Sequence, residues 1–156
     1  MTLTLGSAAP VFTLADQGGK IRSLKDFKGG KVVLYFYPKD DSPGCTTEAC
    51  NFRDAYAELR KLGATVIGIS PDSVESHAAF ASTYALPITL LADPARETIK
   101  KYGAWGKKTL YGKEYDGVLR STVLIDEKGM IVKLYPTASP ETHVDEVIAD
   151  LKVANA

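Results

Sequence analysis

The chain has 156 residues, of which 45% are hydrophobic and 24% are charged, as in ordinary soluble globular proteins. Its 19 lysines and arginines balance 19 acidic residues, so no basic excess points to nucleic-acid binding. No apolar run approaches the roughly 20 residues that span a bilayer, and the N-terminus lacks the basic start of a secretory signal. These properties predict one domain over residues 1–156, located in the cytoplasm.

Strands and helices are predicted to alternate along the chain. Residues 32–37 form a β-branched and aromatic run, which is typical of a central strand buried on both faces. Glycine and proline punctuate the rest at short intervals. We expect, in order, a hairpin of 12–14 with 21–24, a strand at 32–37, a helix from Ser42-Pro43 to Leu62, a strand at 65–70, a helix from Asp72 to 84, a strand at 86–91, a helix at 93–102, a long loop at 103–119, strands at 121–126 and 130–135, and a helix from Ser139-Pro140 onward.

Two helices carry clear apolar stripes at helical spacing. The first follows the strand at 32–37, and the second closes the chain. Their apolar or small residues are Cys45, Ala49, Phe52, Tyr56 and Leu59 in the first, and Val144, Val147, Ile148 and Leu151 in the second. This order of elements predicts an α/β fold with a mixed central sheet flanked by helices. It is similar to a thioredoxin-like fold with an N-terminal β-hairpin extension.

Cys45 is expected in the first turn of a helix, just beyond the end of a buried strand. Sites in open α/β sheets form at such strand ends. Unpaired N–H groups and the positive end of the helix dipole stabilise a thiolate there. A small buried core cysteine is an equally good interpretation of this position by itself. Cys50 favours the reactive reading, because it lies off the apolar face beside Arg53 and Asp54.

The two cysteines fit neither of two common motifs. Four residues separate them, so they do not form a CxxC motif. They also lack the spacing of a zinc site with His77 and His143. Both histidines are predicted to be surface or helix-flank residues. The sequence predicts no metal ligands and shows no flavin or haem motif.

The stretch YPKDDSPGCTTEAC resembles the active-site loop of the peroxiredoxins, in particular their Q-type, or bacterioferritin-comigratory-protein, subfamily. The family pattern Pro-x-x-x-Thr/Ser-x-x-Cys is met by Pro38, Ser42 and Cys45, and many Q-type members carry a second cysteine five positions on, here Cys50. The segment GVLRSTVLID, with Arg120, and the tract WGKKTLYGKEYDG before it are also similar. Ser42 stands where threonine is more usual, which keeps the hydroxyl and loses the methyl group that restrains it.

The resemblance implies a role for each of these residues. Cys45 would attack a peroxide as a thiolate and become a sulfenic acid. Arg120 would stabilise the thiolate and donate hydrogen bonds to the peroxide. The Ser42 hydroxyl and the N–H groups of Gly44 and Cys45 would position the peroxide. Pro38 would shield the thiolate from water.

The resemblance also implies the rest of the cycle. Cys50 would be the resolving thiol that forms an intramolecular disulfide with Cys45, which thioredoxin or a similar thiol reductant would reopen. No cofactor is implied, and Q-type relatives suggest a monomer. Glu48 is either a helix-end charge or the partner of an active-site cation. Alternative functions are a thioredoxin-like thiol–disulfide oxidoreductase and a redox-sensing protein or chaperone.

The disulfide carries a geometric prediction. In a regular helix, positions 45 and 50 place their Cα atoms about 8.7 Å apart. A disulfide needs Cα atoms within about 7 Å of each other. We therefore expect the helix between about Pro43 and Cys50 to unwind before the bond forms.

Overall fold

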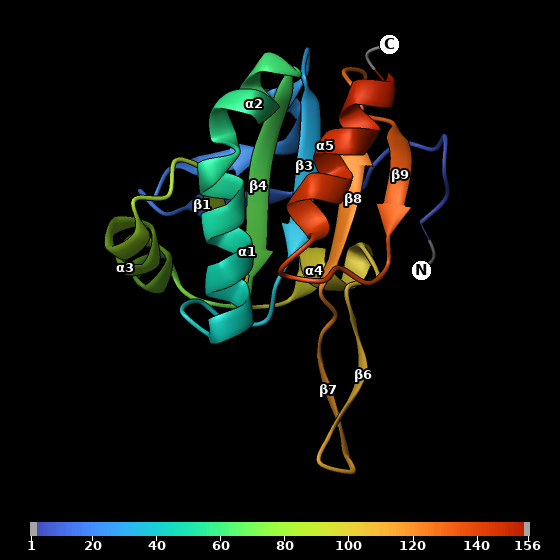
Figure 1. Cartoon of the computed structure of the whole chain (residues 1–156). Coiled ribbons are helices and arrows are strands. Elements are labelled where there is room, and N and C mark those ends of the chain that lie inside the picture. Colours follow the sequence, from blue (N-terminus) through green and yellow to red (C-terminus); the bar gives the residue numbers. More distant parts are fainter. Residues whose placement is uncertain (1–2, 155–156) are drawn as a thin grey trace.

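The computed structural model describes residues 3–154 of the chain, which form a helix-flanked sheet and a projecting hairpin (Figure 1). Within these residues, no helix is long and apolar enough to cross a membrane. In chain order the elements are β1 (Thr13–Asp16), β2 (Ile21–Ser23), the 3-10 helix η1 (Leu24–Phe27), β3 (Lys31–Phe36), α1 (Pro43–Asp54), α2 (Tyr56–Lys61), β4 (Ala64–Ser70), α3 (Val74–Tyr84), β5 (Thr89–Ala92), α4 (Glu97–Lys101), β6 (Trp105–Leu110), β7 (Lys113–Val118), β8 (Ser121–Ile125), β9 (Ile131–Tyr135) and α5 (His143–Ala154).

The main sheet has seven strands in the order β2-β1-β5-β4-β3-β8-β9. Strands β3, β4 and β5 are parallel, whereas β8, β9 and β1 join antiparallel. The predicted mixed sheet and the N-terminal hairpin of β1 and β2 are therefore confirmed. The hairpin lies at one edge of the sheet, where β1 pairs with β5.

Strand β3 is buried on both faces, as its continuous apolar run predicts. Val33 and Tyr35 pack in one core with residues of α1, α2, α3 and α5. Val32 and Leu34 point the other way, into a second core that includes Ile99 of α4. Two cores with one shared strand explain why β3 carries no polar alternation.

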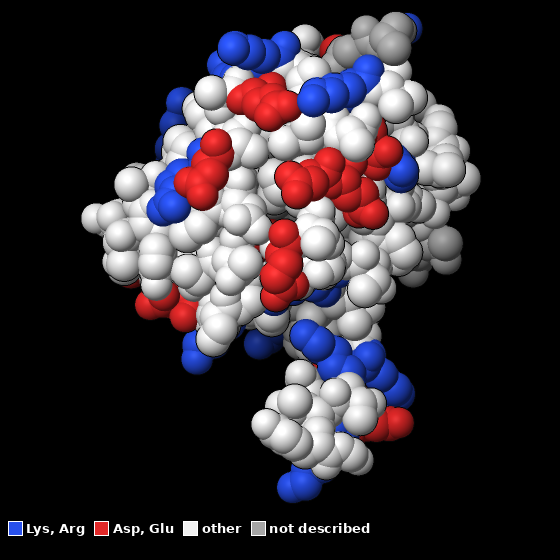
Figure 2. Space-filling model, viewed as in Figure 1, with Lys and Arg blue, Asp and Glu red and all other residues white. Residues whose placement is uncertain are grey.

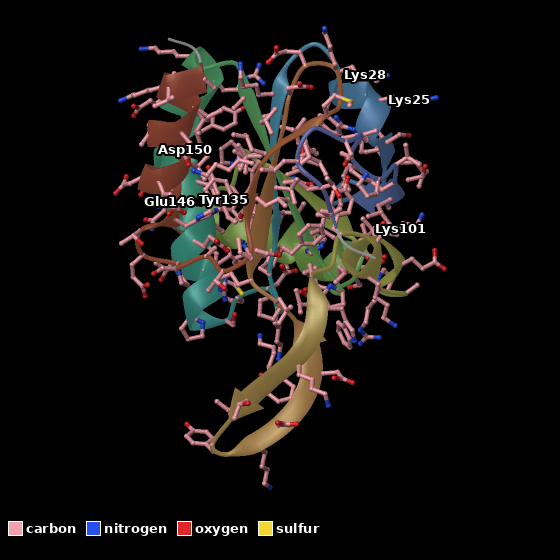
Figure 3. All side chains as sticks on the ribbon, turned by 90° about the vertical axis from the view of Figure 1, so that its right-hand side faces the viewer. Lys25, Lys28, Lys101, Tyr135, Glu146 and Asp150 are labelled. Carbon is pink, nitrogen blue, oxygen red and sulfur yellow. The ribbon has the colours of Figure 1, made fainter. Side chains whose placement is uncertain are left out.

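The stripe of α5 is buried as predicted. This helix also contacts the edge strand β9 through polar groups. The hydroxyl of Tyr135 and the ammonium of Lys133 both bind the carboxylate of Asp150, so helix and strand are joined at the surface (Figure 3). The contact holds α5 over the same face of the sheet as α1.

Several predicted helix boundaries were wrong. The helix expected from Ser42 to Leu62 is divided into α1 and α2 at Ala55, whose backbone leaves the helical region. No proline or glycine marks this bend, and the apolar face continues across it, so periodicity alone could not reveal it. Helix α3 is capped by Ser73 and not by Asp72. The Asp72 carboxylate instead accepts hydrogen bonds from the Asp40 amide and the Ser70 hydroxyl.

The prediction of a long loop over 103–119 was also wrong. Strands β6 and β7 form a two-stranded hairpin that projects from the body in both Figure 1 and Figure 3. Its turn has positive φ at Tyr111 (52°) and Gly112 (76°), as in a type I′ turn. Both faces of the distal hairpin are exposed, so no buried face imposed the alternation by which strands are recognised. Lysine side chains lie along it (Figure 2).

Candidate active site

The candidate site lies where β3 ends and α1 begins. Antiparallel pairing sets Phe36, at the end of β3, opposite Ser121, at the start of β8. Arg120 immediately precedes β8, so this register brings it to the loop that leads into α1. Residues 75 positions apart in the sequence thereby meet, and the Arg120 guanidinium donates a hydrogen bond to the sulfur of Cys45.

Cys45 lies in the first turn of α1 and is only 1% exposed. Its Sγ atom is 3.3 Å from Nη2 of Arg120, whose Nη1 is 2.9 Å from Oε1 of Glu48. Burial alone would lower the pKa of Arg120, but Cys45 and Glu48 outweigh burial and raise it. The guanidinium is therefore a permanent cation held between a sulfur and a carboxyl group.

Gly44 makes this approach possible. A Cβ atom at this position would lie 3.2 Å from Nη2 of Arg120 and 3.5 Å from the ring of Pro140. A side chain at position 44 would therefore crowd the guanidinium. As first-turn residues, Gly44 and Cys45 also have N–H groups without a carbonyl partner inside the helix. Their amides are thus available to an anion or a peroxide oxygen.

Glu48, three positions after Cys45 in α1, is completely buried. One carboxyl oxygen binds Arg120, whereas Oε2 has no hydrogen-bond partner, and neither has the nearby buried hydroxyl of Tyr35. Burial raises the pKa of Glu48 to about 7, although the Arg120 cation partly opposes the shift. Glu48 is therefore the partner of an active-site cation, which was one of its two predicted roles.

Ser42 occupies the N-cap position of α1 without capping it through its side chain. Its Oγ donates a hydrogen bond to the Lys39 carbonyl at 2.9 Å. Because the hydroxyl proton is engaged there, the oxygen is left to accept a hydrogen bond from another donor. Pro38, half-buried, begins the same loop. The roles predicted for these two residues stay predictions.

Cys50 is partly exposed and lies in α1 with Cys45, and both are free thiols. The helix between them is unbroken, as the prediction that it must unwind before disulfide formation assumes. At helical spacing their Cα atoms are too far apart for a disulfide. Any bond between these two thiols requires a change in α1.

Both histidines are buried, whereas the sequence predicted surface or helix-flank positions for them. His77 of α3 places Nδ1 2.7 Å from Oδ2 of Asp40 and Nε2 2.9 Å from the Leu91 carbonyl. Burial would raise the pKa of Asp40, but hydrogen bonds from His77, Tyr37 and Ser76 lower it. The His77 ring is therefore held on both sides, by the Asp40 carboxylate and by the Leu91 carbonyl. The pair fastens the loop before Cys45 to α3.

Sequence reasoning missed this Asp40 cluster because its members are far apart in the chain. Tyr84 of α3 adds a second attachment, since its hydroxyl donates to the carboxylate of Asp41 at 2.6 Å. Asp41 has a φ of 61°, which is uncommon for a residue other than glycine. Oxygens of Asp40 and Asp72 and a nitrogen of His77 lie within 4.8 Å of one another. Each already takes part in hydrogen bonds within the protein, so we assign the cluster to holding the loop.

The importance of this attachment can be measured. We expect His77→Ala to lower the free energy of unfolding by about 3–5 kcal/mol, because it removes a buried ring and leaves the Asp40 carboxylate without the hydrogen bond to that ring. His143→Ala is the matched control: this histidine is also buried, but it binds the Thr122 hydroxyl and the exposed Glu146. Urea denaturation gives both values. A loss for His77→Ala no larger than that for His143→Ala contradicts the assignment.

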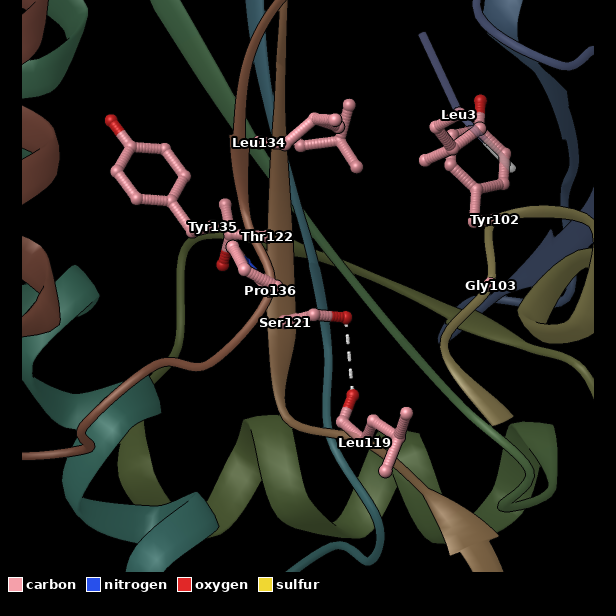
Figure 4. A pocket seen from close by; sticks show the side chains of 10 residues that line it. Leu3, Tyr102, Gly103, Leu119, Ser121, Thr122, Leu134, Tyr135 and Pro136 are labelled. Carbon is pink, nitrogen blue, oxygen red and sulfur yellow. Dashed lines mark hydrogen bonds between the residues drawn. The ribbon is translucent and has the colours of Figure 1, made fainter. Parts of the chain in front are cut away.

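A pocket of about 300 Å³ lies elsewhere (Figure 4). It is lined by Leu3, Tyr102, Gly103, Leu119, Ser121, Thr122, Val123, Leu134, Tyr135 and Pro136. Leu119 and Ser121 flank Arg120 in sequence and point into the pocket, whereas the Arg120 side chain points to Cys45. The pocket and the cysteine thus lie on opposite sides of this segment, and the pocket does not contribute to the site.

Comparisons with known proteins agree with this geometry. The sequence profile of the AhpC/TSA family matches residues 5–134. A putative peroxiredoxin bcp of Coxiella burnetii is 48% identical over 151 residues, covering 97% of this chain and 100% of the relative. Peroxiredoxin Bcp of Bacillus subtilis is 43% identical and covers 97% of each chain.

Solved structures give the same result. A peroxiredoxin Q mutant of Xylella fastidiosa superposes with a TM-score of 0.92 at 30% identity, covering 99% of this chain and 98% of that one. The bacterioferritin comigratory protein of Xanthomonas campestris has a TM-score of 0.87 at 34% identity, covering 93% and 92%. The predicted thioredoxin-like fold is confirmed. The chain belongs to the AhpC/TSA family, within its peroxiredoxin Q, or Bcp, group.

Proposed function

We propose that this protein is a thiol-dependent peroxidase in which Cys45 reduces hydrogen peroxide and organic hydroperoxides. The observation that carries the proposal is the Cys45 sulfur in the first turn of α1, 3.3 Å from the Arg120 guanidinium. A helix N-terminus and a permanent cation both favour the thiolate, which is the nucleophilic form. Burial of the sulfur limits its contact with larger electrophiles.

The first step oxidises Cys45. Its thiolate attacks the terminal peroxide oxygen, the O–O bond breaks, and the sulfur becomes a sulfenic acid. The other oxygen leaves with the electron pair and takes up a proton, giving water or an alcohol. Arg120 donates hydrogen bonds to the peroxide, the N–H groups of Gly44 and Cys45 stabilise charge on it, and the Ser42 oxygen accepts a hydrogen bond from the peroxide O–H. Pro38 limits access of water.

The second step resolves the sulfenic acid. The thiolate of Cys50 attacks the Cys45 sulfur, the S–O bond breaks, and the departing hydroxide takes up a proton to give water as an intramolecular disulfide forms. A dithiol protein, thioredoxin, then reduces the bond and is itself oxidised to a disulfide. We further propose that the protein acts as a monomer, since both reactive cysteines belong to one chain. We also propose that it is located in the cytoplasm, where cellular reductants keep thiols reduced.

The decisive experiment is peroxide consumption with thioredoxin, thioredoxin reductase and NADPH, with each component omitted in turn. We expect NADPH oxidation to require all of them. Reduction of insulin disulfides is measured in parallel. Rapid insulin reduction without peroxide turnover would instead identify a thiol–disulfide oxidoreductase.

Disulfide formation should leave a structural trace. We expect oxidised protein to lose helical structure between Pro43 and Cys50, because the bond cannot form across the intact helix. Gly44 and two threonines in this segment make its unwinding cheaper than a break further along α1. Amide hydrogen exchange should show faster exchange there in the oxidised state and unchanged exchange in α5. An intact helix in fully disulfide-bonded protein, or a disulfide only between chains, contradicts the mechanism.

Glu48 should make the oxidation rate depend on pH near neutrality. As pH rises through about 7, Glu48 ionises and partly neutralises Arg120, whose charge then supports the Cys45 thiolate less. We therefore expect the pH profile of Cys45 oxidation to fall or flatten near pH 7, and Glu48→Gln to remove this inflection. Stopped-flow rates with hydrogen peroxide test it. An unchanged inflection in the variant excludes Glu48 as its source.

A further inference from the structure

The β6–β7 hairpin has two chemically different faces. Its register sets Lys108 opposite Tyr115 and Leu110 opposite Lys113, and opposed residues point to the same side. These four residues form one side, which we call the basic–aromatic face. The other side carries Lys107 and Thr109 opposite Asp116 and Glu114. One face therefore has two cations and no carboxylate, whereas the other has one cation and two carboxylates.

The basic–aromatic face leads directly to the Cys45 site. The stem of Lys108 lies across Gly117, where a Cβ atom would be 3.1 Å from its Cδ. Its ammonium donates to the carbonyl of Val118 at 2.8 Å, two residues before Arg120. Burial, and then the neighbouring Arg120 cation, lower the pKa of Lys108. Three cations, Arg120, Lys108 and Lys113, therefore follow one another from the Cys45 sulfur along the hairpin.

The hairpin tip has features that its own folding does not require. Tyr111 is 95% exposed, and Leu110 and Tyr115 are also largely exposed. Tyr111 occupies a positive-φ turn position that asparagine, aspartate or glycine would adopt with less strain. Exposed tyrosine and leucine on an isolated two-stranded ribbon contribute nothing to a core, and tyrosine is enriched at protein interfaces.

The position of the hairpin indicates which kind of partner binds its basic–aromatic face. It projects from the same end of the molecule at which α1 begins, so a protein that approaches the cysteines passes beside it (Figures 1 and 2). Building on the proposed peroxidase function, we infer that the basic–aromatic face, with Tyr111, is the docking surface for the acidic protein dithiol that reduces the Cys45–Cys50 disulfide. A complementary partner would carry carboxylates beside an apolar patch near its own thiols.

Reduction by a protein dithiol requires the partner to bind close to the disulfide. A thiolate of the partner attacks one sulfur of the Cys45–Cys50 disulfide, and a mixed disulfide forms. The second thiol of the partner then releases the peroxidase with both cysteines reduced. The partner leaves as a disulfide, so no other reductant is needed at this step. A small dithiol performs the same exchange without touching the hairpin, which separates docking from chemistry.

The test compares two reductants with hairpin variants. The double variant Tyr111→Ser/Lys113→Glu should lower kcat/KM for an acidic thioredoxin about tenfold or more, as loss of an interface anchor does. Turnover driven by dithiothreitol should stay unchanged. Lys107→Glu, with the same charge change on the opposite face, should leave both activities nearly unchanged. Added salt should weaken thioredoxin kinetics in the wild type more than in the double variant.

The outcomes are distinct. Unchanged thioredoxin kinetics in the double variant, or an equal loss in Lys107→Glu, overturns the docking surface. So does sedimentation that shows a wild-type dimer and a monomeric double variant, which would assign the face to a second copy. Absence of dithiothreitol-driven peroxide turnover in the wild type contradicts the proposed function itself.

Discussion

We expect Cys45→Ser to reduce peroxide turnover by at least about 10³-fold, to the level of the uncatalysed reaction. A serine hydroxyl is barely ionised at neutral pH, so the cation of Arg120 and the N-terminus of α1 have no thiolate to stabilise. The substitution removes little volume, and the buried position of Cys45 can accept it. Peroxide consumption with thioredoxin, thioredoxin reductase and NADPH measures the effect.

Cys50→Ser is the matched control for this variant. It changes the other thiol of the same helix. Cys50 is partly exposed, whereas Cys45 is only 1% exposed. We expect it to consume about one equivalent of peroxide and then stop with thioredoxin, because the sulfenic acid at Cys45 is not resolved. Substantial thioredoxin-dependent turnover by Cys45→Ser contradicts the assignment of the nucleophile.

Arg120→Ala should have the second largest effect, slowing oxidation of Cys45 by about 10²–10³-fold. The guanidinium lies 3.3 Å from the sulfur, and its loss also leaves the buried Glu48 without its cation. Loss of the cation disfavours negative charge on Cys45. Arg120→Lys should restore the rate only in part, because the single nitrogen of an ammonium cannot reproduce the planar fork in which Nη2 reaches the sulfur and Nη1 reaches the carboxylate.

Rapid mixing with hydrogen peroxide gives these rates, and the ultraviolet absorbance of the thiolate gives its titration. Arg22→Ala is a suitable control, since Arg22 is also paired with a carboxylate, Asp16, at 3.2 Å but belongs to β2. If Arg120→Ala oxidises as fast as the Arg22 variant and keeps the wild-type thiolate titration, Arg120 serves only the structure.

Patterns over short distances in the sequence were enough to predict the main elements of the fold. The β-branched run at 32–37 and the stripe of α5 correspond to buried elements, because burial imposes a regular apolar pattern on residues that are close in sequence. Serine and proline before Cys45 likewise marked the start of α1. The resemblance of the loop to peroxiredoxins added Ser42 and Arg120 as candidate residues.

Only the tertiary structure decided how the site is held. The pairing of β3 with β8 brings Arg120 to Cys45, and the packing of α3 buries His77 against Asp40. The burial that gives Glu48 its raised pKa comes from elements far away in sequence. The hairpin escaped prediction for the opposite reason: with no buried face, its strands carry no pattern that burial imposes. The spacing of apolar residues in the sequence reflects burial along one helix or strand. Charge pairing and desolvation instead arise where separate elements meet, so the sequence pattern does not reveal them.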